Sequence, residues 1–252
     1  MPDVSAIVKA YDVRGVVPDQ LNDDVARAFG TAFVTLLARE GDVPGVVVGH
    51  DMRPSSPALA TAFADGVAAA GADVVHIGLA STDLLYFASG HLALPGAMFT
   101  ASHNPAQYNG IKLCRAGAAP VGEDSGLTVL RDLVNADGVA REPAHRGTVR
   151  EQAVVDAYAE HLHSLVDLRA SRRLRVVVDA GNGMAGLTVP VVFGRLPFEL
   201  VPMYFELDGN FPNHEANPIE PANLVDLQRR IVAESADIGL AFDGDADRCF
   251  VV

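Results

Sequence analysis

The sequence predicts an α/β protein, because segments with the pattern of buried strands alternate along the chain with segments that have helical spacing. Short apolar runs such as GVVVG at residues 45–49 and IGLAF at residues 238–242 are typical of strands. A polar stretch near residues 137–150 divides this alternation into two cycles. We therefore expect two consecutive α/β domains, residues 1–147 and 148–252, with a boundary near Gly147.

In the first cycle, the clearest helix is predicted over residues 22–40, with Asn22 as its N-cap and Gly41 as its stop. Its apolar residues follow helical spacing: Val25, Ala28, Phe29, Ala32, Phe33, Leu36 and Leu37. The other predicted elements are a strand at 45–49, a helix at about 56–70, a strand at 73–77, a short helix opened by Thr82 and a strand at 96–100.

The second cycle follows the same logic, with predicted helices at 151–166, near 183–192 and at 222–235. Strands are predicted at 174–178, near 198–204 and at 238–242. In an α/β sheet, ligands bind beyond the carboxyl ends of the strands, so the loops at those ends are where chemistry is expected.

Composition and charge exclude several classes of protein. The formal net charge of -13 over 252 residues would repel a phosphate backbone, so we expect no nucleic-acid partner. The start of the chain lacks the order of a signal peptide and no apolar run is long enough to span a bilayer, which predicts no membrane partner. Cys114 and Cys249 lie far apart in apolar, strand-like segments, so two free core thiols in a cytoplasmic protein are expected.

The serine loop, residues 100–105 (TASHNP), follows the predicted strand at 96–100 and should expose Ser102 at a strand end. A serine hydroxyl needs a base, a metal or prior activation to act as a nucleophile, and ordinary turn chemistry is an equal alternative for these residues. A serine hydrolase is not favoured, because adjacent Ser102 and His103 cannot readily face each other and no G-x-S-x-G elbow surrounds them.

The aspartate loop, residues 243–248 (DGDADR), follows the strand IGLAF directly. Its alternating carboxylates, Asp243, Asp245 and Asp247, can direct oxygen ligands at one hard cation such as Mg²⁺. A solvated acidic turn is the alternative, although an uncompensated cluster beside apolar strands would be costly. An EF-hand is excluded because Arg248 occupies the position where that loop needs glycine, and Arg248 instead offers a fork for phosphate.

The glycine loop, residues 181–186 (GNGMAG), formally matches G-x-G-x-x-G, with Glu206 a plausible distance further on. Gly181, Gly183 and Gly186 therefore make an NAD-binding oxidoreductase one alternative. Glycines at a strand-to-helix turn are also what close packing requires, and we favour this structural interpretation. A third class, a haloacid-dehalogenase-like phosphatase with Asp243 as nucleophile, is suggested by the strand followed by D-x-D.

Taken in order, KAYDVRG, GHDMRPSSP, TASHNP with NGIK, DAGNGMAG, NPIEPANL and FDGDADR resemble the alpha-D-phosphohexomutase superfamily, most closely its phosphomannomutase/phosphoglucomutase branch. The resemblance implies mixed sheets sandwiched by helices, as in the first two domains of that family. It also implies that the sugar-recognition and C-terminal phosphate-binding domains, III and IV, lie outside these 252 residues.

The resemblance implies roles for individual residues. Ser102 would carry the phosphoryl group, and Ser102, Asp243, Asp245 and Asp247 would hold Mg²⁺. Arg248 would contact the phosphate, and the catalytic network would include Arg14, His103 and Lys112. The substrates would be phosphorylated hexoses, with a hexose 1,6-bisphosphate as intermediate and no NAD. Lys112 could act as general base only if Arg14 or burial lowered its pKa.

Overall fold

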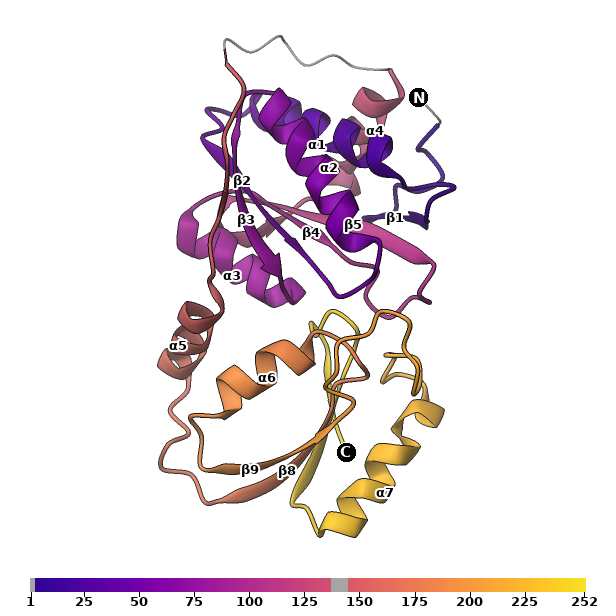
Figure 1. Ribbon diagram of the computed structural model, residues 1–252. Helices are drawn as coiled ribbons and strands as arrows, with labels where there is room; N and C mark the ends of the chain where they lie inside the picture. The colour runs from indigo at the N-terminus through magenta and orange to yellow at the C-terminus, as the bar shows by residue number, and fades with distance from the viewer. Residues whose placement is uncertain (1–2, 137–144) are drawn as a thin grey trace.

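The computed structural model describes residues 3–136 and 145–252. Most of the polar stretch predicted from Asp137 falls on residues 137–144, outside the described part. The described residues form two α/β lobes that follow each other along the chain (Figure 1). Each lobe has a mixed sheet with helices on both faces, so the predicted fold class is confirmed.

The first lobe is built on a mixed sheet in the order β1-β5-β4-β2-β3-β7, with β6 paired to β5. The central strands β4, β2, β3 and β7 run parallel, whereas β5 is antiparallel to both β4 and β1. The bounds are β1 Val13–Val16, β2 Gly45–His50, β3 Asp73–Leu79, β4 Gly96–Phe99, β5 Tyr108–Arg115, β6 Ala119–Pro120 and β7 Val149–Glu151.

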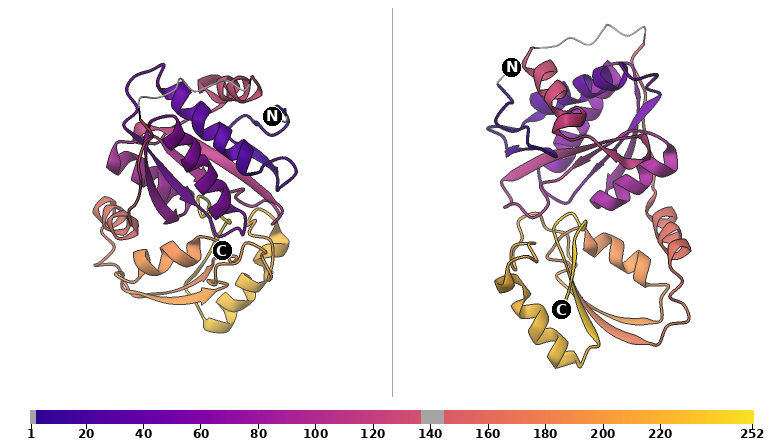
Figure 2. Two further views of the ribbon diagram at one scale, coloured as in Figure 1. Left: turned by 45° about the horizontal axis from the view of Figure 1, so that its top comes forward. Right: turned by 180° about the vertical axis from the view of Figure 1, so that it is seen from behind.

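Helices cover both faces of this sheet because its central strands are buried on both sides. Val46 and Val48 of β2 pack with α1 (Asp23–Leu37), α2 (Ser56–Ala69) and α4 (Leu127–Asn135). Val47, whose side chain points the other way, packs with α3 (Thr82–Leu92) and α5 (Val155–Leu165). The two helix layers lie on opposite sides of the sheet in Figures 1 and 2.

The second lobe repeats the scheme on a smaller sheet, in the order β11-β10-β8-β9. Val176 and Val178 of β8 face α6 (Ala185–Phe193), and Val177 faces α7 (Val225–Glu234). Strands β8, β9 and β10 are parallel and β11 is antiparallel to β10. The strand bounds are β8 Leu174–Asp179, β9 Phe198–Met203, β10 Ile238–Phe242 and β11 Cys249–Val251.

Several elements differ from the prediction. The helix predicted from residue 151 begins at Val155, because residues 149–151 form β7 and pair with β3. The sheet of the first lobe therefore extends beyond Gly147. Strands β1 and β6 and helix α4 were not predicted, and β5 was recognised only as a strand-like segment around Cys114. The N-cap of α3 is Ser81, and Thr82 is the first helical residue. The expectation of two core thiols is wrong for Cys249, which is exposed on the edge strand β11, whereas Cys114 is buried.

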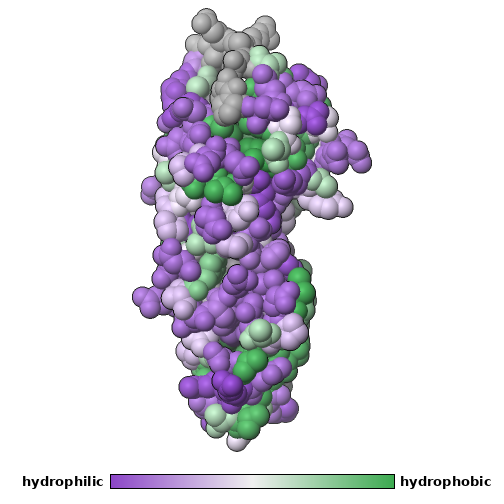
Figure 3. Space-filling model, turned by 90° about the vertical axis from the view of Figure 1, so that its right-hand side faces the viewer, coloured by the Kyte–Doolittle hydropathy of each residue, from purple (hydrophilic) through white to green (hydrophobic). Residues whose placement is uncertain are grey.

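The two lobes meet through the loops at the carboxyl ends of their strands. The serine loop follows β4 and the aspartate loop follows β10, and side chains of these loops are hydrogen-bonded across the junction. A narrowed waist between the lobes is visible on the mainly hydrophilic surface of Figure 3. Among the residues described, no helix is long and apolar enough to cross a membrane.

Candidate active site

The serine loop holds Ser102 in a backbone conformation that side chains rarely adopt. Its φ is 51°, in the left-handed region, and only 3% of the residue is exposed. The Ser102 backbone N–H donates to Thr100 Oγ1 at 2.9 Å. A strained residue persists only where its surroundings fix it, so the contacts of this loop are informative.

Arg53, directly after β2, is the residue that fixes the loop. Its guanidinium is buried and donates to four backbone carbonyls, those of Ser102, Asn104, Pro105 and Tyr108, at 2.7–3.0 Å. Its Nε donates to Asp51 Oδ2 at 3.2 Å. The five N–H donors of the side chain are thereby all used. One buried cation thus gathers the carbonyls of the serine loop on its inner side.

The aspartate loop brings its three carboxylates together. One oxygen from each of Asp243, Asp245 and Asp247 lies within 4.8 Å of the others. Asp243 and Asp245 are fully buried, and the side chain of Asp247 is 30% exposed. The loop closes on itself because the Arg248 N–H donates to Asp243 Oδ1 at 3.0 Å.

Ser102 and the aspartate loop are in direct contact. The Ser102 hydroxyl donates to Asp243 Oδ2 at 2.7 Å and accepts from Arg248 Nη2 at 2.5 Å. Gly244 makes this approach possible, since a Cβ at that position would lie 2.4 Å from the Ser102 carbonyl oxygen. A serine of the first lobe and a carboxylate of the second therefore share one site.

The donors fit a divalent cation. Asp245 Oδ1 is buried and, among the described residues, has no hydrogen-bond partner, although a buried carboxylate oxygen is costly to leave unpaired. Asp245 Oδ2, by contrast, accepts from Lys112 Nζ at 2.6 Å. Oxygen atoms from three carboxylates are the ligands that Mg²⁺ prefers. Asp243, Asp245 and Asp247 could therefore hold Mg²⁺ beside Ser102.

Local charges shift the pKa values of these carboxylates in opposite directions. Burial, followed by repulsion from Asp245 and Asp247, raises the pKa of Asp243 to about 7. Burial also acts on Asp245, but the neighbouring Lys112 ammonium outweighs it and lowers the pKa of Asp245 to about 2. The cluster therefore carries more negative charge than Lys112 and Arg248 balance.

Lys112 does not meet the condition set for a general base. Burial alone would lower its pKa, but Asp245 and Asp247 accept from Nζ at 2.6 and 2.7 Å and raise the pKa of Lys112 above its usual range. The condition of a lowered pKa is therefore not met in this arrangement. Lys112, on β5, is a charged counter-ion of the aspartate loop.

His103 and Arg14 complete the set of predicted residues. Burial, with Arg248 and Arg14 nearby, lowers the pKa of His103, so its ring is neutral. His103 Nδ1 accepts from Arg248 Nη2 at 2.6 Å, which leaves the ring proton on Nε2. Arg14, on β1, donates to Asn104 Oδ1 of the serine loop at 2.5 Å and forms an ion pair with Asp12.

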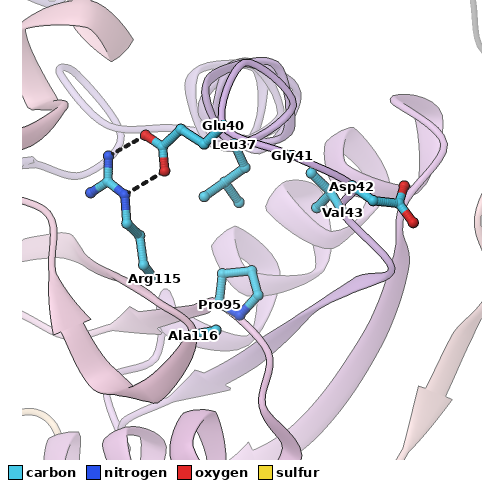
Figure 4. A pocket seen from close by; sticks show the side chains of 8 residues that line it. All are labelled: Leu37, Glu40, Gly41, Asp42, Val43, Pro95, Arg115 and Ala116. Atoms are coloured by element: carbon cyan, nitrogen blue, oxygen red, sulfur yellow. Dashed lines mark hydrogen bonds and ion pairs between the residues drawn. The ribbon is translucent and has the colours of Figure 1, made fainter.

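Most of the predicted site residues, but not the buried Asp243 and Asp245, line an open cavity of about 620 Å³. Its lining includes Arg14, Ser102, His103, Lys112, Asp247 and Arg248. A smaller cavity of 230 Å³ lies at the opposite ends of the strands of the first sheet, near the start of β2 and β4, where Arg115 pairs with Glu40 (Figure 4). That cavity is lined by residues just before β2 and β4, away from the strand ends that carry the serine and aspartate loops.

The glycine loop supports the aspartate loop. A Cβ on Gly183 would lie 2.7 Å from the Gly244 carbonyl oxygen, and the Met184 N–H donates to that oxygen at 2.9 Å. The N–H groups of Gly181, Asn182 and Gly183 also have protein acceptors, so they are not available to a pyrophosphate. This geometry favours the structural interpretation over dinucleotide binding.

Sequence reasoning missed two residues that hold the site together, Arg53 and Thr82. Arg53 stands in the segment GHDMRPSSP, but a single arginine after a strand gives no sign that it is buried. Thr82 was predicted only to open a short helix, whereas its hydroxyl also donates to Asp245 Oδ2 at 2.6 Å. No local pattern pairs residue 82 with residue 245, because they belong to different lobes.

Comparison with known proteins supplies the family. Residues 5–137 match the profile of phosphoglucomutase/phosphomannomutase alpha/beta/alpha domain I, and residues 156–252 match that of domain II. The sequence is 48% identical over 245 residues to phosphohexose mutases of Xanthomonas campestris, which covers 96% of this chain and 53% of that protein. It is 41% identical over 252 residues to a phosphomannomutase of Escherichia coli, with 96% and 54% covered.

A solved structure supports the same family assignment. The phosphoglucomutase/phosphomannomutase family protein of Burkholderia thailandensis superposes with a TM-score of 0.89 at 41% identity, covering 98% of this chain and 54% of that one. The chain thus spans about half the length of the relatives it matches. With both domain profiles matched in order over the two lobes, the chain belongs to the phosphoglucomutase/phosphomannomutase family, of which it contains domains I and II.

Proposed function

We propose that this chain is the phosphoserine- and metal-binding half of a phosphohexomutase, which interconverts the 1-phosphate and 6-phosphate of mannose, glucose or both. The observation that carries this proposal is the 2.7 Å contact between the Ser102 hydroxyl and Asp243, at the junction of the two lobes. The same cavity is lined by Ser102 and by the cationic side chains of Arg14, Lys112 and Arg248, together with Asp12 and Asp247, and the cations support a phosphorylated sugar as substrate.

Ser102 explains how one site can serve both ends of a hexose. In the proposed reaction, the bond between phosphorus and Ser102 Oγ breaks as a bond to the free sugar hydroxyl forms, giving a hexose 1,6-bisphosphate. The hydroxyl gives up its proton and Ser102 Oγ gains one. After the sugar turns over, the other phosphoryl group returns to Ser102, and the isomerised monophosphate leaves.

Phosphoryl transfer depends mainly on alignment and on balancing the charge of the phosphoryl oxygens. Arg248 suits this role because its Nη2 already donates to Ser102 Oγ while two of its nitrogens donate to Asp243 Oδ2. We assign Asp243, Asp245 and Asp247 as the residues that would hold Mg²⁺, with Ser102 or its phosphate beside them. The ion would supply positive charge to the oxygens of the transferring group.

The remaining residues orient the serine and the substrate. Neutral His103 accepts from Arg248, which keeps the guanidinium fork turned toward Ser102. Arg14 holds Asn104 and lines the cavity, where it can meet a substrate phosphate. Lys112 would take up the hydroxyl proton only after losing its bonds to Asp245 and Asp247.

The proposal is tested by transferring a phosphoryl group to the 252-residue chain from glucose 1,6-bisphosphate in the presence of Mg²⁺. We expect intact-mass analysis to show one added phosphoryl group, and peptide mapping to place it on Ser102 as an ester that survives hydroxylamine. Ser102→Ala should abolish the transfer while the chain keeps its unfolding temperature. A sample treated with phosphatase beforehand provides the unphosphorylated starting material.

The same experiment distinguishes the mutase from the phosphatase alternative. A haloacid-dehalogenase-like phosphatase would form an acyl phosphate on Asp243 that hydroxylamine cleaves. Labelling that persists in the Ser102→Ala chain and is removed by hydroxylamine would therefore refute the mutase proposal. We expect full turnover only when the chain is combined with domains equivalent to the remainder of the matched relatives, because those relatives are about twice as long.

A further inference from the structure

The first residue of helix α3, in the first lobe, forms two hydrogen bonds with the aspartate loop of the second lobe. The Thr82 N–H donates to the Asp245 carbonyl oxygen at 3.0 Å, and Thr82 Oγ1 donates to Asp245 Oδ2 at 2.6 Å. Both residues are fully buried. These bonds fix the backbone and the side chain of Asp245 together.

The two carboxylate oxygens of Asp245 have different surroundings. Oδ2 accepts from both Thr82 Oγ1 and Lys112 Nζ, each at 2.6 Å, whereas the buried Oδ1 has no partner among the described residues. Because the two oxygens of a carboxylate are equivalent, a half-turn of the group would change nothing. What Thr82 and Lys112 fix together is the orientation of the carboxylate, with one oxygen held by both donors and the other left free to bind a cation.

The two donors are not equivalent. The Lys112 ammonium is at the end of a flexible chain and is shared with Asp247, at 2.7 Å. The Thr82 hydroxyl is held by the first turn of a helix that is itself anchored. Ser81 caps α3 by accepting from the Leu84 N–H at 3.2 Å, and its hydroxyl donates to Asp83 Oδ1 at 2.5 Å.

Asp83 is anchored in turn by a hydrogen bond from the Tyr158 hydroxyl of α5. The first turn of α3 is thus fixed to the helix that connects the two lobes. A hydroxyl held in this way is preorganised, and it offers Asp245 one direction only.

We propose that Thr82 is a positioning residue for the cation site: its hydroxyl holds Asp245 so that Oδ1 faces the ion, and it makes cation affinity depend on contact between the two lobes. This inference rests on the proposed function only in requiring a divalent cation at the aspartate loop. Loss of such a supporting hydrogen bond typically weakens metal binding by about tenfold to a hundredfold.

The test compares Thr82→Val, which keeps the shape and removes the hydroxyl, with Thr82→Ser, which keeps the hydroxyl. Mn²⁺ is the probe, because its binding to the 252-residue chain is measured directly by electron paramagnetic resonance, and Mg²⁺ affinity follows by competition. Thr61→Val is the matched control, since Thr61 is exposed on α2 and bonds only within its own helix. Thermal unfolding without added metal reports on folding.

We expect Thr82→Val to bind Mn²⁺ about tenfold or more weakly, and Thr82→Ser and Thr61→Val to bind like the parent chain. Equal affinity in a folded Thr82→Val chain, or equal weakening in Thr82→Ser, would overturn the inference. If Thr82→Val fails to fold, Thr82→Ala takes its place in the same comparison. A parent chain that binds no Mn²⁺, or binds it equally after Asp245→Asn, would instead refute the cation site of the proposed function.

Discussion

Arg53 should be a large single contributor to the stability of the first lobe. Replacing it by methionine keeps most of the side-chain volume but leaves the buried Asp51 carboxylate and four carbonyl oxygens without their donor. Breaking a buried ion pair by removing one partner costs about 3–5 kcal/mol. Each buried acceptor left unpaired adds about 1–3 kcal/mol where water cannot replace the donor.

We therefore expect Arg53→Met to lower the free energy of unfolding by about 4 kcal/mol or more, a large share of the roughly 5–15 kcal/mol typical of a folded domain. Arg53→Lys keeps the charge but has three donors in place of five, so its free energy of unfolding should lie between those of Arg53→Met and the parent chain. Arg27→Met is the control, because Arg27 is half exposed and pairs with Asp24 on the surface of α1, where such pairs contribute little.

Urea unfolding followed by circular dichroism measures these differences, and hydrogen exchange of residues 102–108 reports whether the serine loop itself loosens. In Arg53→Met we expect exchange in that loop to become faster even under conditions where the lobe stays folded, since its carbonyls no longer converge on one cation. A loss below about 1 kcal/mol, with unchanged protection of the loop, would refute the reasoning.

In a complete enzyme, Asp245→Asn should lower turnover at least about a hundredfold, or about 2.7 kcal/mol, and unchanged turnover at limiting Mg²⁺ would contradict the metal assignment. Gly244→Ala places a methyl group 2.4 Å from the Ser102 carbonyl oxygen and should slow phosphoserine formation about tenfold or more. Gly41→Ala should not slow it, because a methyl group there would meet no other part of the described chain within 4 Å, and equal rates for the two variants would count against the contact. His214 Nε2 lies 2.9 Å from Asp179 Oδ2, and its Nδ1 lies 2.8 Å from the Glu215 carbonyl oxygen. The hydrogen bond to Asp179 raises the pKa of His214 above 6.5, although burial opposes this shift. The folded state therefore binds this proton more tightly than the unfolded state, so the proton stabilises the fold fully below pH 6.5 and no longer does so once the pH has risen through the raised pKa. The free energy of unfolding of a His214→Gln chain should not change with pH in this way. An identical pH profile for the two chains would exclude the effect.

The α/β fold could be predicted because its strands and helices have recognisable local sequence patterns. Strands such as β2 and β10 are short apolar runs, and α1 has both a cap at Asn22 and helical spacing. Strand β5 was recognised only as a strand-like segment around Cys114, because it also carries the polar side chains of Asn109 and Lys112. Asn109 donates to Ser55 and Ser56, and Lys112 donates to the aspartate loop, so these two residues interrupt the apolar strand pattern.

The site could be predicted only as a set of separate loops. Ser102 and the three aspartates follow strand ends, which is sufficient to nominate them. The sequence carries no local signal that Arg53 gathers four carbonyls, or that Thr82 touches Asp245, because those contacts depend on where the loops meet in space. For the same reason the sequence could not show whether the pKa of Lys112 is lowered or raised, since its two carboxylate partners come from the other lobe.

The charges of the site bear on how an acidic chain could accept the phosphorylated substrate that we propose. When all three are ionised, Asp243, Asp245 and Asp247 carry three negative charges against the two positive charges of Lys112 and Arg248. Burial is the main cause of the raised pKa of Asp243, and repulsion from Asp245 and Asp247 adds to it. A divalent cation would reverse the sign of the cluster, so the mouth of the cavity would attract phosphate only when the ion is bound. Cation binding and phosphoryl binding should therefore be cooperative, although the net charge of the whole chain is -13.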